Sequence, residues 1–366
     1  MSAFIAAACR SPVAPRGGAF AALSLHQIAA PVVQAVLAQA GLDAGDVDEL
    51  ILSNALGAGG NPARIVSLAS GLPERIAGLS IDRQCAGGLD AVLLARQMIL
   101  SGAADVVIAG GAESYSRRPI RLQTFADGRP PEPYDQAPFT PWPDRDPDMA
   151  QAAHRLGQTL GISRMSQDDW AVQSHAKAHA HNRPGSDLIP LAGVHSDTFT
   201  RTLTPALCRR AKIINGDVTT ANTAVAADGA AFCVVVSAKV ARRLRAPRVE
   251  IIGGETIGGT PDLPGLAPVA AIQKVLARAG LAPTAIHKAE IMEAFAVQAI
   301  ACVRGAGLDP GIVNGGGGAL ARGHPIGASG AINAARLYHD LTQVGGVGLA
   351  AIAAAGGIGT ALLLRA

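Results

Sequence analysis

The sequence predicts a layered α/β fold made of two similar halves with a long insertion between them. Short apolar runs alternate with stretches of helical period over residues 1–116 and again over residues 246–366. The alternation breaks down over residues 117–245, where eight prolines fall between positions 119 and 147 and interrupt regular elements. Each flanking part also brings an apolar strand up to a double glycine, Gly110-Gly111 in one and Gly356-Gly357 in the other. Strands alternating with helices are typical of α/β proteins, so we interpret the chain as a duplicated α/β half interrupted by an inserted domain.

The elements of the first half follow from their hydrophobic period. After Cys85, apolar residues such as Leu89, Val92 and Ile99 recur at three- and four-residue steps, which predicts a helix. The other stretches of the half are assigned in the same way. The predicted strands are 4–9, 49–52, 78–81 and 105–108, and the predicted helices are 25–40, 61–70 and the one that follows Cys85.

The insertion and the second half are assigned by the same reasoning. Within the insertion, residues 166–181 have the composition of one helix. From residue 246 onward the alternation returns. The predicted strands are 249–252, 289–292, 347–353 and 359–364, and the predicted helices are 267–279, 296–304 and 328–341.

Bulk composition excludes several classes of protein. With 49% hydrophobic and 16% charged residues, the chain can build a large core, and a net charge of +3 is too small to indicate nucleic-acid binding. The five cysteines form no CxxC pair, which argues against a disulfide framework or a structural zinc site. We expect a cytoplasmic protein without a signal peptide or membrane helix. Arginine pairs such as Arg117-Arg118 are usually solvated, although one of them could contact the phosphates of a nucleotide-tailed substrate.

Cys85 is the first candidate for chemistry. It lies between a short apolar run and the start of a predicted helix, where free backbone N–H groups favour negative charge. We therefore expect a lowered thiol pKa and a reactive thiolate. An isolated cysteine is more often a buried structural residue, so this interpretation depends on what else the chain contains.

His324 is the second candidate. It belongs to the segment Gly323-His324-Pro325-Ile326-Gly327-Ala328-Ser329-Gly330, which again precedes a helix. A lone histidine is more often structural. Paired with a cysteine that the other half presents at the same kind of turn, it becomes a candidate base for that thiol.

At this point the chain resembles the thiolases, the acyl-CoA acetyltransferases that make or cleave β-ketoacyl-CoA. The resemblance covers nearly the whole length. It implies a five-layered thiolase-like fold, an inserted loop domain that binds coenzyme A, and a homodimer or homotetramer. It also implies coenzyme A thioesters as substrates, with no separate cofactor and no metal. Its markers are Arg10-Ser11-Pro12, Asn61-Pro62-Ala63-Arg64, Cys85-Ala86-Gly87-Gly88-Leu89, Gly110-Gly111-Ala112-Glu113-Ser114, Glu293-Ala294-Phe295-Ala296, Gly323 to Gly330, and Gly356-Gly357-Ile358-Gly359.

The resemblance also implies roles for the matching positions. Cys85 would attack the thioester and carry the acyl group, and His324 would activate it. The backbone N–H groups of Cys85 and Ala355, where the family has glycine, would form the oxyanion hole. The residues implied to bind coenzyme A are Met149, Asn222, Ala224 and Phe295.

Two departures from the family pattern remove groups that act on the carbon nucleophile in the Claisen step. Met292 replaces an asparagine that fixes a water beside the enolate oxygen, and losing such a donor costs about 10²–10³-fold in rate. Ala353 replaces the cysteine that moves the proton of the carbon nucleophile, a loss of roughly 10²–10⁴-fold. A third substitution, Ala224 for a small hydroxyl residue, removes one possible hydrogen bond to pantetheine.

The departures leave several hypotheses open. The leading one is a thiolase-family acyltransferase with a Cys85 acyl-enzyme and an atypical Claisen step. The alternatives are an acyl-CoA hydrolase, an acyltransferase to a heteroatom acceptor, and a non-catalytic subunit that binds acyl-CoA or scaffolds a partner. Glu293 could supply the missing base. Other motifs are weaker: the pair His175 and His179 lacks an acidic partner for zinc, Gly315 to Gly318 is interpreted as a turn, and Glu113 as structural.

Overall fold

The computed structural model describes residues 2–57, 59–181 and 187–366. Nine strands form a single continuous path, with the N-terminal and C-terminal halves meeting where β1 pairs antiparallel with β11. The path runs β12 (Lys288–Ile291), β13 (Val347–Ala354), β14 (Ile358–Arg365), β11 (Val249–Gly258), β1 (Ala3–Arg10), β10 (Ala227–Ser237), β5 (Val106–Glu113), β3 (Glu49–Ser53) and β4 (Leu79–Ile81).

The two halves repeat one pairing pattern. In the first, β1 and β5 each pair antiparallel with β10, and β5 pairs parallel with β3. In the second, β11 and β13 each pair antiparallel with β14, and β13 pairs parallel with β12. The predicted duplication is confirmed at the level of topology.

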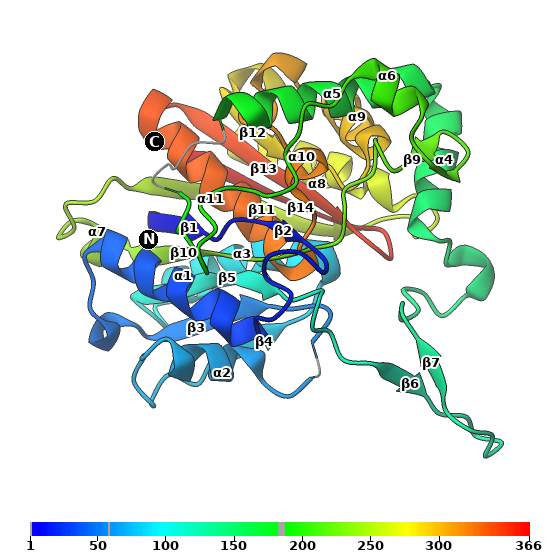
Figure 1. The fold of residues 1–366 in the computed structure, drawn as a ribbon. Helices are drawn as coiled ribbons and strands as arrows, with labels where there is room; N and C mark the ends of the chain where they lie inside the picture. Colours follow the sequence, from blue (N-terminus) through cyan, green and yellow to red (C-terminus); the bar gives the residue numbers. More distant parts are fainter. Residues whose placement is uncertain (1, 58, 182–186) are drawn as a thin grey trace.

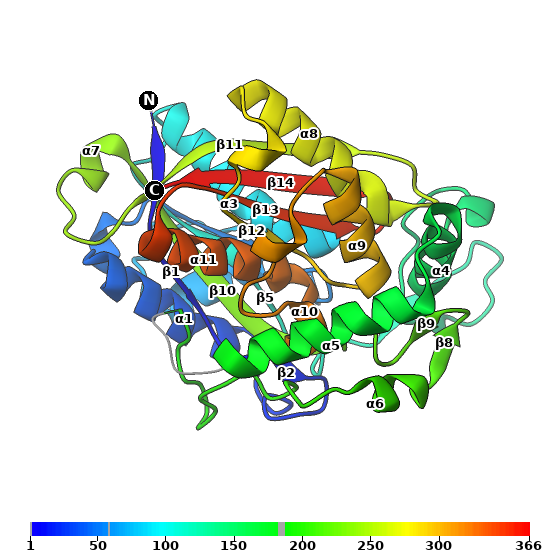
Figure 2. The ribbon, with the colours of Figure 1, turned by 90° about the horizontal axis from the view of Figure 1, so that it is seen from above.

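Helices complete five layers around the two halves of the sheet (Figures 1 and 2). The helices α3 (Gly87–Leu100) and α11 (Ile326–Val344) pack between the halves, and their apolar residues share one core with residues of both. The helices α1 (Leu25–Ala40) and α2 (Pro62–Ala69) cover the outer face of the first half. The helices α8 (Ala267–Ala279) and α9 (Ala296–Gly305) cover that of the second. The central strands β5, β10 and β13 are therefore buried on both faces. Because neither face meets water, their sequences are nearly continuous runs of apolar residues.

Local signals explain where the best predicted helices begin and end. The helix α1 starts at Ser24, whose backbone N–H donates to the Gln27 side chain in a capping box, and stops at Gly41 in the left-handed conformation at φ +69°. The helix α8 ends in the same way at Gly280, φ +64°. The predictions 25–40 and 267–279 are confirmed at both ends.

The structure corrects three assignments in and around the insertion. The strand β10 and the short helix α7 (Ala238–Ala241) fall inside the predicted insertion, residues 117–245, but β10 is a central strand of the sheet. The helix α4 (Met149–Leu160), capped by the Asp148 side chain, was not predicted. The pair Gly110-Gly111 lies inside β5 rather than after it, and a Cβ at Gly111 would lie 1.9 Å from the Gly327 oxygen. These positions are dictated by tertiary contacts that a local pattern does not contain.

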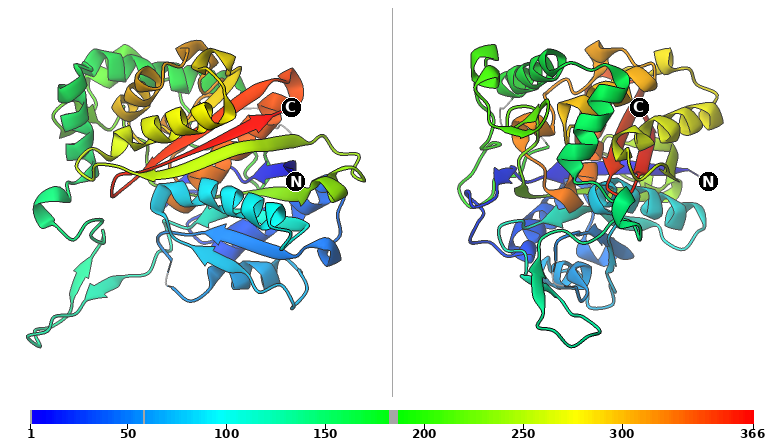
Figure 3. Two further views of the ribbon diagram at one scale, coloured as in Figure 1. Left: turned by 180° about the vertical axis from the view of Figure 1, so that it is seen from behind. Right: turned by 90° about the vertical axis from the view of Figure 1, so that its right-hand side faces the viewer.

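The rest of the insertion wraps the second half and extends away from it. The helix α5 (Arg164–His181) crosses the face that carries α9 and α10 (Figure 2). A hairpin of β6 (Arg121–Gln123) and β7 (Glu132–Tyr134) projects from the body of the molecule (Figure 3). The remaining short elements are β2 (Ala14–Pro15), α6 (Pro205–Arg209), β8 (Ile213–Asn215), β9 (Val218–Thr219) and α10 (Ala319–Arg322), with 3-10 turns at Ala44–Asp46, Gln84–Ala86, Pro143–Arg145, Pro264–Leu266, Pro283–Ala285 and Pro310–Ile312. Among the described helices, none is long and apolar enough to cross a membrane.

Candidate active site

Cys85 lies on a tight turn between β4 and α3. It is the middle residue of the 3-10 turn Gln84–Ala86, one residue before the first turn of α3. Gln84 has φ +49°, in the left-handed region, and its backbone N–H donates to the Asp82 carboxylate at 2.9 Å. Non-glycine residues in that region cost about 1–3 kcal/mol and are concentrated at functional sites. The turn presents the partly buried Cys85 thiol at one end of the central helix layer.

His324 reaches the same point from the second half. It lies between α10 and α11, and its backbone N–H donates to the Val225 oxygen at 2.7 Å. Its Nε2 atom lies 3.1 Å from the Cys85 sulfur, although 239 residues separate the two in sequence. The predicted meeting of these two side chains is therefore present in the structure.

Close packing of α3 against α11 brings the two turns together. A Cβ on Gly88 would lie 2.7 Å from the Ala331 backbone nitrogen, and one on Gly330 would lie 2.4 Å from the Leu89 nitrogen. Any side chain at either position would push the helices apart. The glycines of the two motifs thus set the distance between the thiol and the imidazole.

Ser329 fixes the tautomer of His324. The Ser329 hydroxyl donates its single proton to the Pro325 backbone oxygen at 3.0 Å, and Ser329 Oγ itself lies 2.7 Å from His324 Nδ1. The hydroxyl oxygen must then accept from Nδ1–H. This arrangement leaves the lone pair of Nε2 facing the Cys85 thiol, as a base requires.

Burial determines the protonation of the pair. Desolvation raises the pKa of the Cys85 thiol to about 12, and its own backbone N–H acts more weakly in the opposite direction. Desolvation also lowers the pKa of His324 to about 4. The expectation of a lowered thiol pKa is therefore wrong, because burial outweighs the effect of the helix terminus. The resting pair is a neutral thiol hydrogen-bonded to a neutral imidazole.

Glu113 ties the His324 segment to the first half. Its buried carboxylate accepts from the backbone N–H of Gly327 at 2.9 Å, of Ala55 at 3.1 Å and of Leu56 at 3.2 Å, and from the Asn54 side chain at 2.7 Å. Burial raises the pKa of Glu113 to about 7. With its oxygens engaged by four donors, Glu113 acts as a clamp between the halves, in line with its interpretation as structural.

A cavity of about 240 Å³ opens beside the Cys85–His324 pair. Its wall includes six of the residues that the sequence singled out: Cys85, Met149, Ala224, Phe295, His324 and Ala355. Asn222 is not in the wall. Its buried side chain accepts from Thr219 N–H at 2.8 Å and donates to Asp168 and to the Asp217 oxygen, so it shapes the loop that carries Ala224.

Neither Met292 nor Ala353 lines this larger cavity. Ala353 lines a smaller cavity of about 50 Å³ that also contacts Cys85 and Ala355. Met292 is 1% exposed and packs into the core between the halves. Glu293 accepts from Trp170 at 3.0 Å, Ser174 at 2.7 Å, Asn314 at 2.7 Å and Leu320 N–H at 3.3 Å. These donors occupy its carboxylate, so the hypothesis that Glu293 replaces the missing base has no support in the geometry.

Gln298 is a residue that the sequence analysis missed. It lies in the first turn of α9, is 3% exposed, and lines the smaller cavity together with Cys85 and Ala353. Neither its amide nitrogen nor its amide oxygen has a hydrogen-bond partner among the described residues. A buried amide without partners is costly, and a cavity of about 50 Å³ has room for a water molecule. Its only sequence signal was a polar residue within an apolar helix start.

The histidines of α5 do not form a metal centre with other residues in the structure. No group of three or more metal-ligating side chains occurs in residues 2–57, 59–181 and 187–366. His175 is buried, accepts from Arg201 N–H at 3.3 Å, and has its pKa lowered to about 4 by desolvation. The five cysteines are free thiols, and all except Cys85 are buried.

Comparison with known proteins identifies both halves of the chain. Residues 3–239 match the family model described as thiolase, N-terminal domain, and residues 245–366 match thiolase, C-terminal domain. A Bacillus subtilis protein named "Putative acetyl-CoA C-acetyltransferase YhfS" is 36% identical, over 100% of this chain and 99% of that protein. A Staphylococcus aureus protein named "Probable acetyl-CoA acyltransferase" is 33% identical over 96% of each.

A solved structure agrees along the whole length. The crystal structure of the Bacillus anthracis acetyl-CoA acetyltransferase superimposes with a TM-score of 0.94 at 30% sequence identity, covering 100% of this chain and 98% of that one. The fold predicted from the sequence is therefore confirmed.

Proposed function

The chain belongs to the thiolase family, and from that premise we propose that it is an acyl-CoA acyltransferase that carries the acyl group on Cys85. The observation that carries the proposal is the 3.1 Å contact between the Cys85 sulfur and His324 Nε2 at the wall of a cavity. The names of the relatives, which are acetyl-CoA acetyltransferases and acyltransferases, point to acyl-CoA substrates.

The acylation step follows from the neutral pair. As the sulfur attacks the thioester carbonyl, Nε2 of His324 takes the thiol proton and the carbonyl oxygen becomes negatively charged. The backbone N–H groups of Cys85 and Ala355 are the proposed donors to that oxygen. Collapse of the intermediate breaks the bond to the sulfur of coenzyme A, and His324 returns the proton to the departing thiolate.

The larger cavity is the proposed site for the end of coenzyme A next to the thioester. Met149, Ala224 and Phe295 give it an apolar wall, which suits the pantetheine arm. Asn222 acts indirectly in this proposal, by holding the loop before Ala224. The inserted segment, from which Met149 and the Asn222 loop come, is then the coenzyme-A-binding part of the chain, and no separate cofactor is needed.

The carbon–carbon step is proposed to be weak. Met292 is buried in the core and Ala353 offers only a methyl group, so neither position supplies a donor or a proton carrier. The acyl group of Cys85 would then pass more readily to water or to a heteroatom acceptor. The unpartnered amide of Gln298, beside Ala353, favours this second candidate because it could position a water near the acyl-enzyme.

The chain is also proposed to act as a homodimer or homotetramer. Two apolar side chains at the projecting hairpin support this proposal, since Ile120 is 86% exposed and Leu122 is 57% exposed. Large apolar side chains in such a position are typical of protein–protein contacts.

Intact-protein mass spectrometry after mixing with acetyl-CoA and longer acyl-CoAs tests the covalent step. We expect a mass gain of one acyl group that is absent in Cys85→Ser and retained in the matched control Cys302→Ser, a thiol on α9. Cleavage of acetoacetyl-CoA with coenzyme A, measured in parallel, then separates a thiolase from another transferase. No adduct from any acyl-CoA would overturn the catalytic proposal in favour of a binding or scaffolding role.

A further inference from the structure

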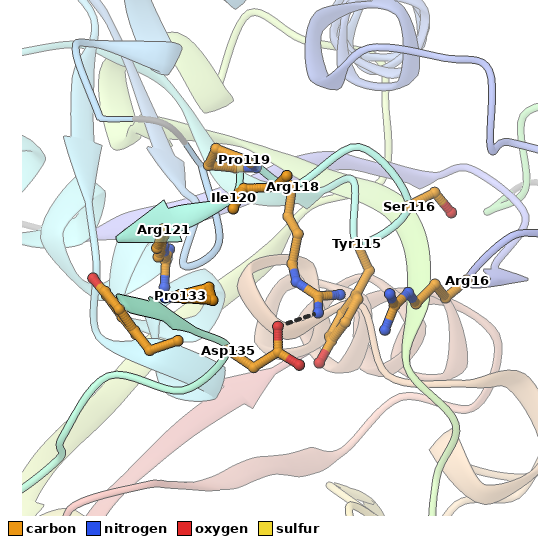
Figure 4. Close-up of a pocket in the computed structure, with 10 residues that line it drawn as sticks. Arg16, Tyr115, Ser116, Arg118, Pro119, Ile120, Arg121, Pro133 and Asp135 are labelled. Carbon is orange, nitrogen blue, oxygen red and sulfur yellow. Dashed lines mark hydrogen bonds and ion pairs between the residues drawn. The ribbon is translucent and has the colours of Figure 1, made fainter. Parts of the chain in front are cut away.

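A second, larger pocket lies at the base of the projecting hairpin (Figure 4). Its volume is about 520 Å³, and its wall includes three arginines, Arg16, Arg118 and Arg121, against a single carboxylate, Asp135. Tyr115 stands between Arg16 and Arg118 in the close-up. The pocket is therefore a concave surface with an excess of positive charge, which suits an anionic group.

Arg118 contacts both an aromatic ring and a carboxylate in this pocket. Its guanidinium lies 4.7 Å from the centre of the Tyr115 ring, and one of its terminal nitrogens, Nη2, donates to Asp135 at 2.8 Å. The other, Nη1, is buried and has no hydrogen-bond partner among the described residues. The Arg118 side chain is 15% exposed whereas that of Asp135 is 87% exposed. The Arg118 guanidinium is thus largely buried, whereas the carboxylate that pairs with it is largely exposed to water.

Two further arginines complete the positive wall. Arg16 lies on the other side of Tyr115, with its guanidinium carbon 5.6 Å from the ring centre. Arg121 is held by a hydrogen bond from Nη2 to the Ala55 oxygen at 2.9 Å. Arginine forks of this kind match the planar geometry of a carboxylate.

This pocket shares part of its wall with the candidate active site. Tyr115, Arg121 and Asp135 line both the arginine pocket and the cavity that contains Cys85 and His324. That cavity, at about 240 Å³, is smaller than the roughly 300–1,000 Å³ pockets that enclose drug-sized ligands. An acyl chain that shares this cavity with the end of the pantetheine arm must be short, and the nucleotide of coenzyme A lies a whole pantetheine arm away from the thioester.

We propose that the pocket lined by Arg16, Arg118 and Arg121 is an anion-binding subsite that takes a carboxylate at the far end of the acyl chain, so that the chain selects short ω-carboxyacyl thioesters. The subsite rests on the proposed function, since Cys85 defines where the thioester lies. Arg118 Nη2 is the donor to which the carboxylate binds, and Asp135, the exposed counterion that now accepts from Nη2, is the group that it displaces.

Equilibrium binding to the Cys85→Ser protein tests the subsite without requiring acylation. Isothermal titration calorimetry would compare glutaryl-CoA with pentanoyl-CoA, which have the same five carbons and differ in the terminal carboxylate. We expect glutaryl-CoA to bind roughly tenfold more tightly, as for a hydrogen bond between charged groups. Arg118→Met should abolish that preference and leave pentanoyl-CoA binding unchanged, whereas Arg118→Lys should retain part of it.

Arg117→Met is the matched control, because Arg117 is the exposed neighbour whose guanidinium donates to the Ala22 oxygen rather than lining the pocket. It should keep the full preference. Asp135→Asn should increase the preference by removing the competing carboxylate. Equal affinity for the two thioesters in the Cys85→Ser protein would overturn the subsite, and so would an equal loss of preference in the Arg117 and Arg118 variants.

The phosphates of coenzyme A are the other possible source of the anion. Glutaryl- and pentanoyl-pantetheine lack those phosphates, and the preference for the carboxylate should persist with them. If Arg118→Met instead weakened both CoA thioesters equally and had no effect on the pantetheine thioesters, the pocket would hold a phosphate and the carboxylate assignment would be wrong. Failure of the proposed function has a different signature, namely normal binding without an acyl-enzyme in the unsubstituted protein.

Discussion

Two groups of residues near Cys85 differ in whether their polar atoms have hydrogen-bond partners. The first group lies at the turns before α3 and α11, and each of its side chains has a partner: the Cys85 thiol contacts His324, and His324 contacts Ser329. The second group lies near the end of β13. Its residues Ala353 and Met292 have no hydrogen-bonding side chain, and the Gln298 amide has no hydrogen-bond partner among the described residues. The first group fits the proposed acylation of Cys85, whereas the side chains of Ala353 and Met292 offer no donor or proton carrier for the proposed carbon–carbon step.

Under the proposed function, the two half-reactions depend on different features of the site. Acylation needs a base, an aligned thiol and backbone donors, which depend on turn geometry and on the packing of two helices. The carbon–carbon step needs a proton carrier and a further donor, which are single side chains. The proposal therefore predicts that the residues at positions 292 and 353 affect the second step and leave the fold and the first step intact.

Removing the proposed base should have the largest effect on the rate of acylation. His324→Gln keeps a side chain of similar size but takes away the lone pair that faces Cys85, so the rate of acyl-enzyme formation should fall by roughly 10²–10⁴-fold. Rapid-quench mass spectrometry would measure it, with His179→Gln on the exposed face of α5 as the control. A loss of less than threefold would mean that His324 does not act as the base.

Restoring the missing proton carrier is the next largest change. Ala353→Cys should raise the rate of acetoacetyl-CoA cleavage by about 10²-fold and leave acyl-enzyme formation nearly unchanged. Ala353→Ser is the matched control, since its hydroxyl has similar size but is far too weak an acid. Similar activity of the two variants would show that Ala353 does not limit the carbon–carbon step.

Loosening the imidazole should have a smaller effect. Ser329→Ala removes the acceptor for His324 Nδ1–H, which costs about 1–1.5 kcal/mol or roughly tenfold in acylation rate. Ser101→Ala, at the exposed end of α3, is the control for loss of a hydroxyl. An unchanged rate would indicate that packing alone sets the tautomer of His324.

Gln298 offers a test through stability. Because both of its amide atoms are buried without partners, Gln298→Met should raise the free energy of unfolding by about 1 kcal/mol and leave the acylation rate within a factor of two. Chemical denaturation would measure the first quantity. A destabilised variant would instead show that the amide binds a water worth retaining.

The pH profile should show the smallest change of all. A His324 pKa of about 4 keeps the imidazole neutral above pH 5, and a Cys85 pKa of about 12 keeps the thiol protonated up to alkaline pH. The reactive neutral pair then persists, so acylation should be nearly constant between pH 5.5 and 9. With a histidine of ordinary pKa, about 6.5, the rate would fall about fivefold between pH 6.5 and 5.5, and a fall of that kind would contradict the desolvated pair.

Much of the fold could be predicted because its signals are local. The helices α1 and α8 are defined by an apolar period and by end signals that lie within or next to the helix. Both were predicted with the bounds that the structure shows. The strand β10 was assigned to the insertion because its place between β1 and β5 depends on residues more than a hundred positions away. Similarly, the arginine pocket assembles residues 16, 118 and 121 with residue 135 of the hairpin, and only the pair Arg117-Arg118 was visible as a motif.

The sequence by itself determined the family and the duplicated halves, since both are a matter of residue identity and spacing. For the same reason it was enough to predict Cys85 as the nucleophile and His324 as its base, and these roles stay predictions. Only the tertiary structure decided that Asn222 holds a loop, that Glu293 is fully engaged, and that the arginines meet beside the active site. It also showed that burial raises the pKa of Cys85, where the sequence had predicted a lowered one. The physical reason is that desolvation and hydrogen-bond partners depend on which residues, distant in sequence, surround a group, and a local pattern carries no record of that environment.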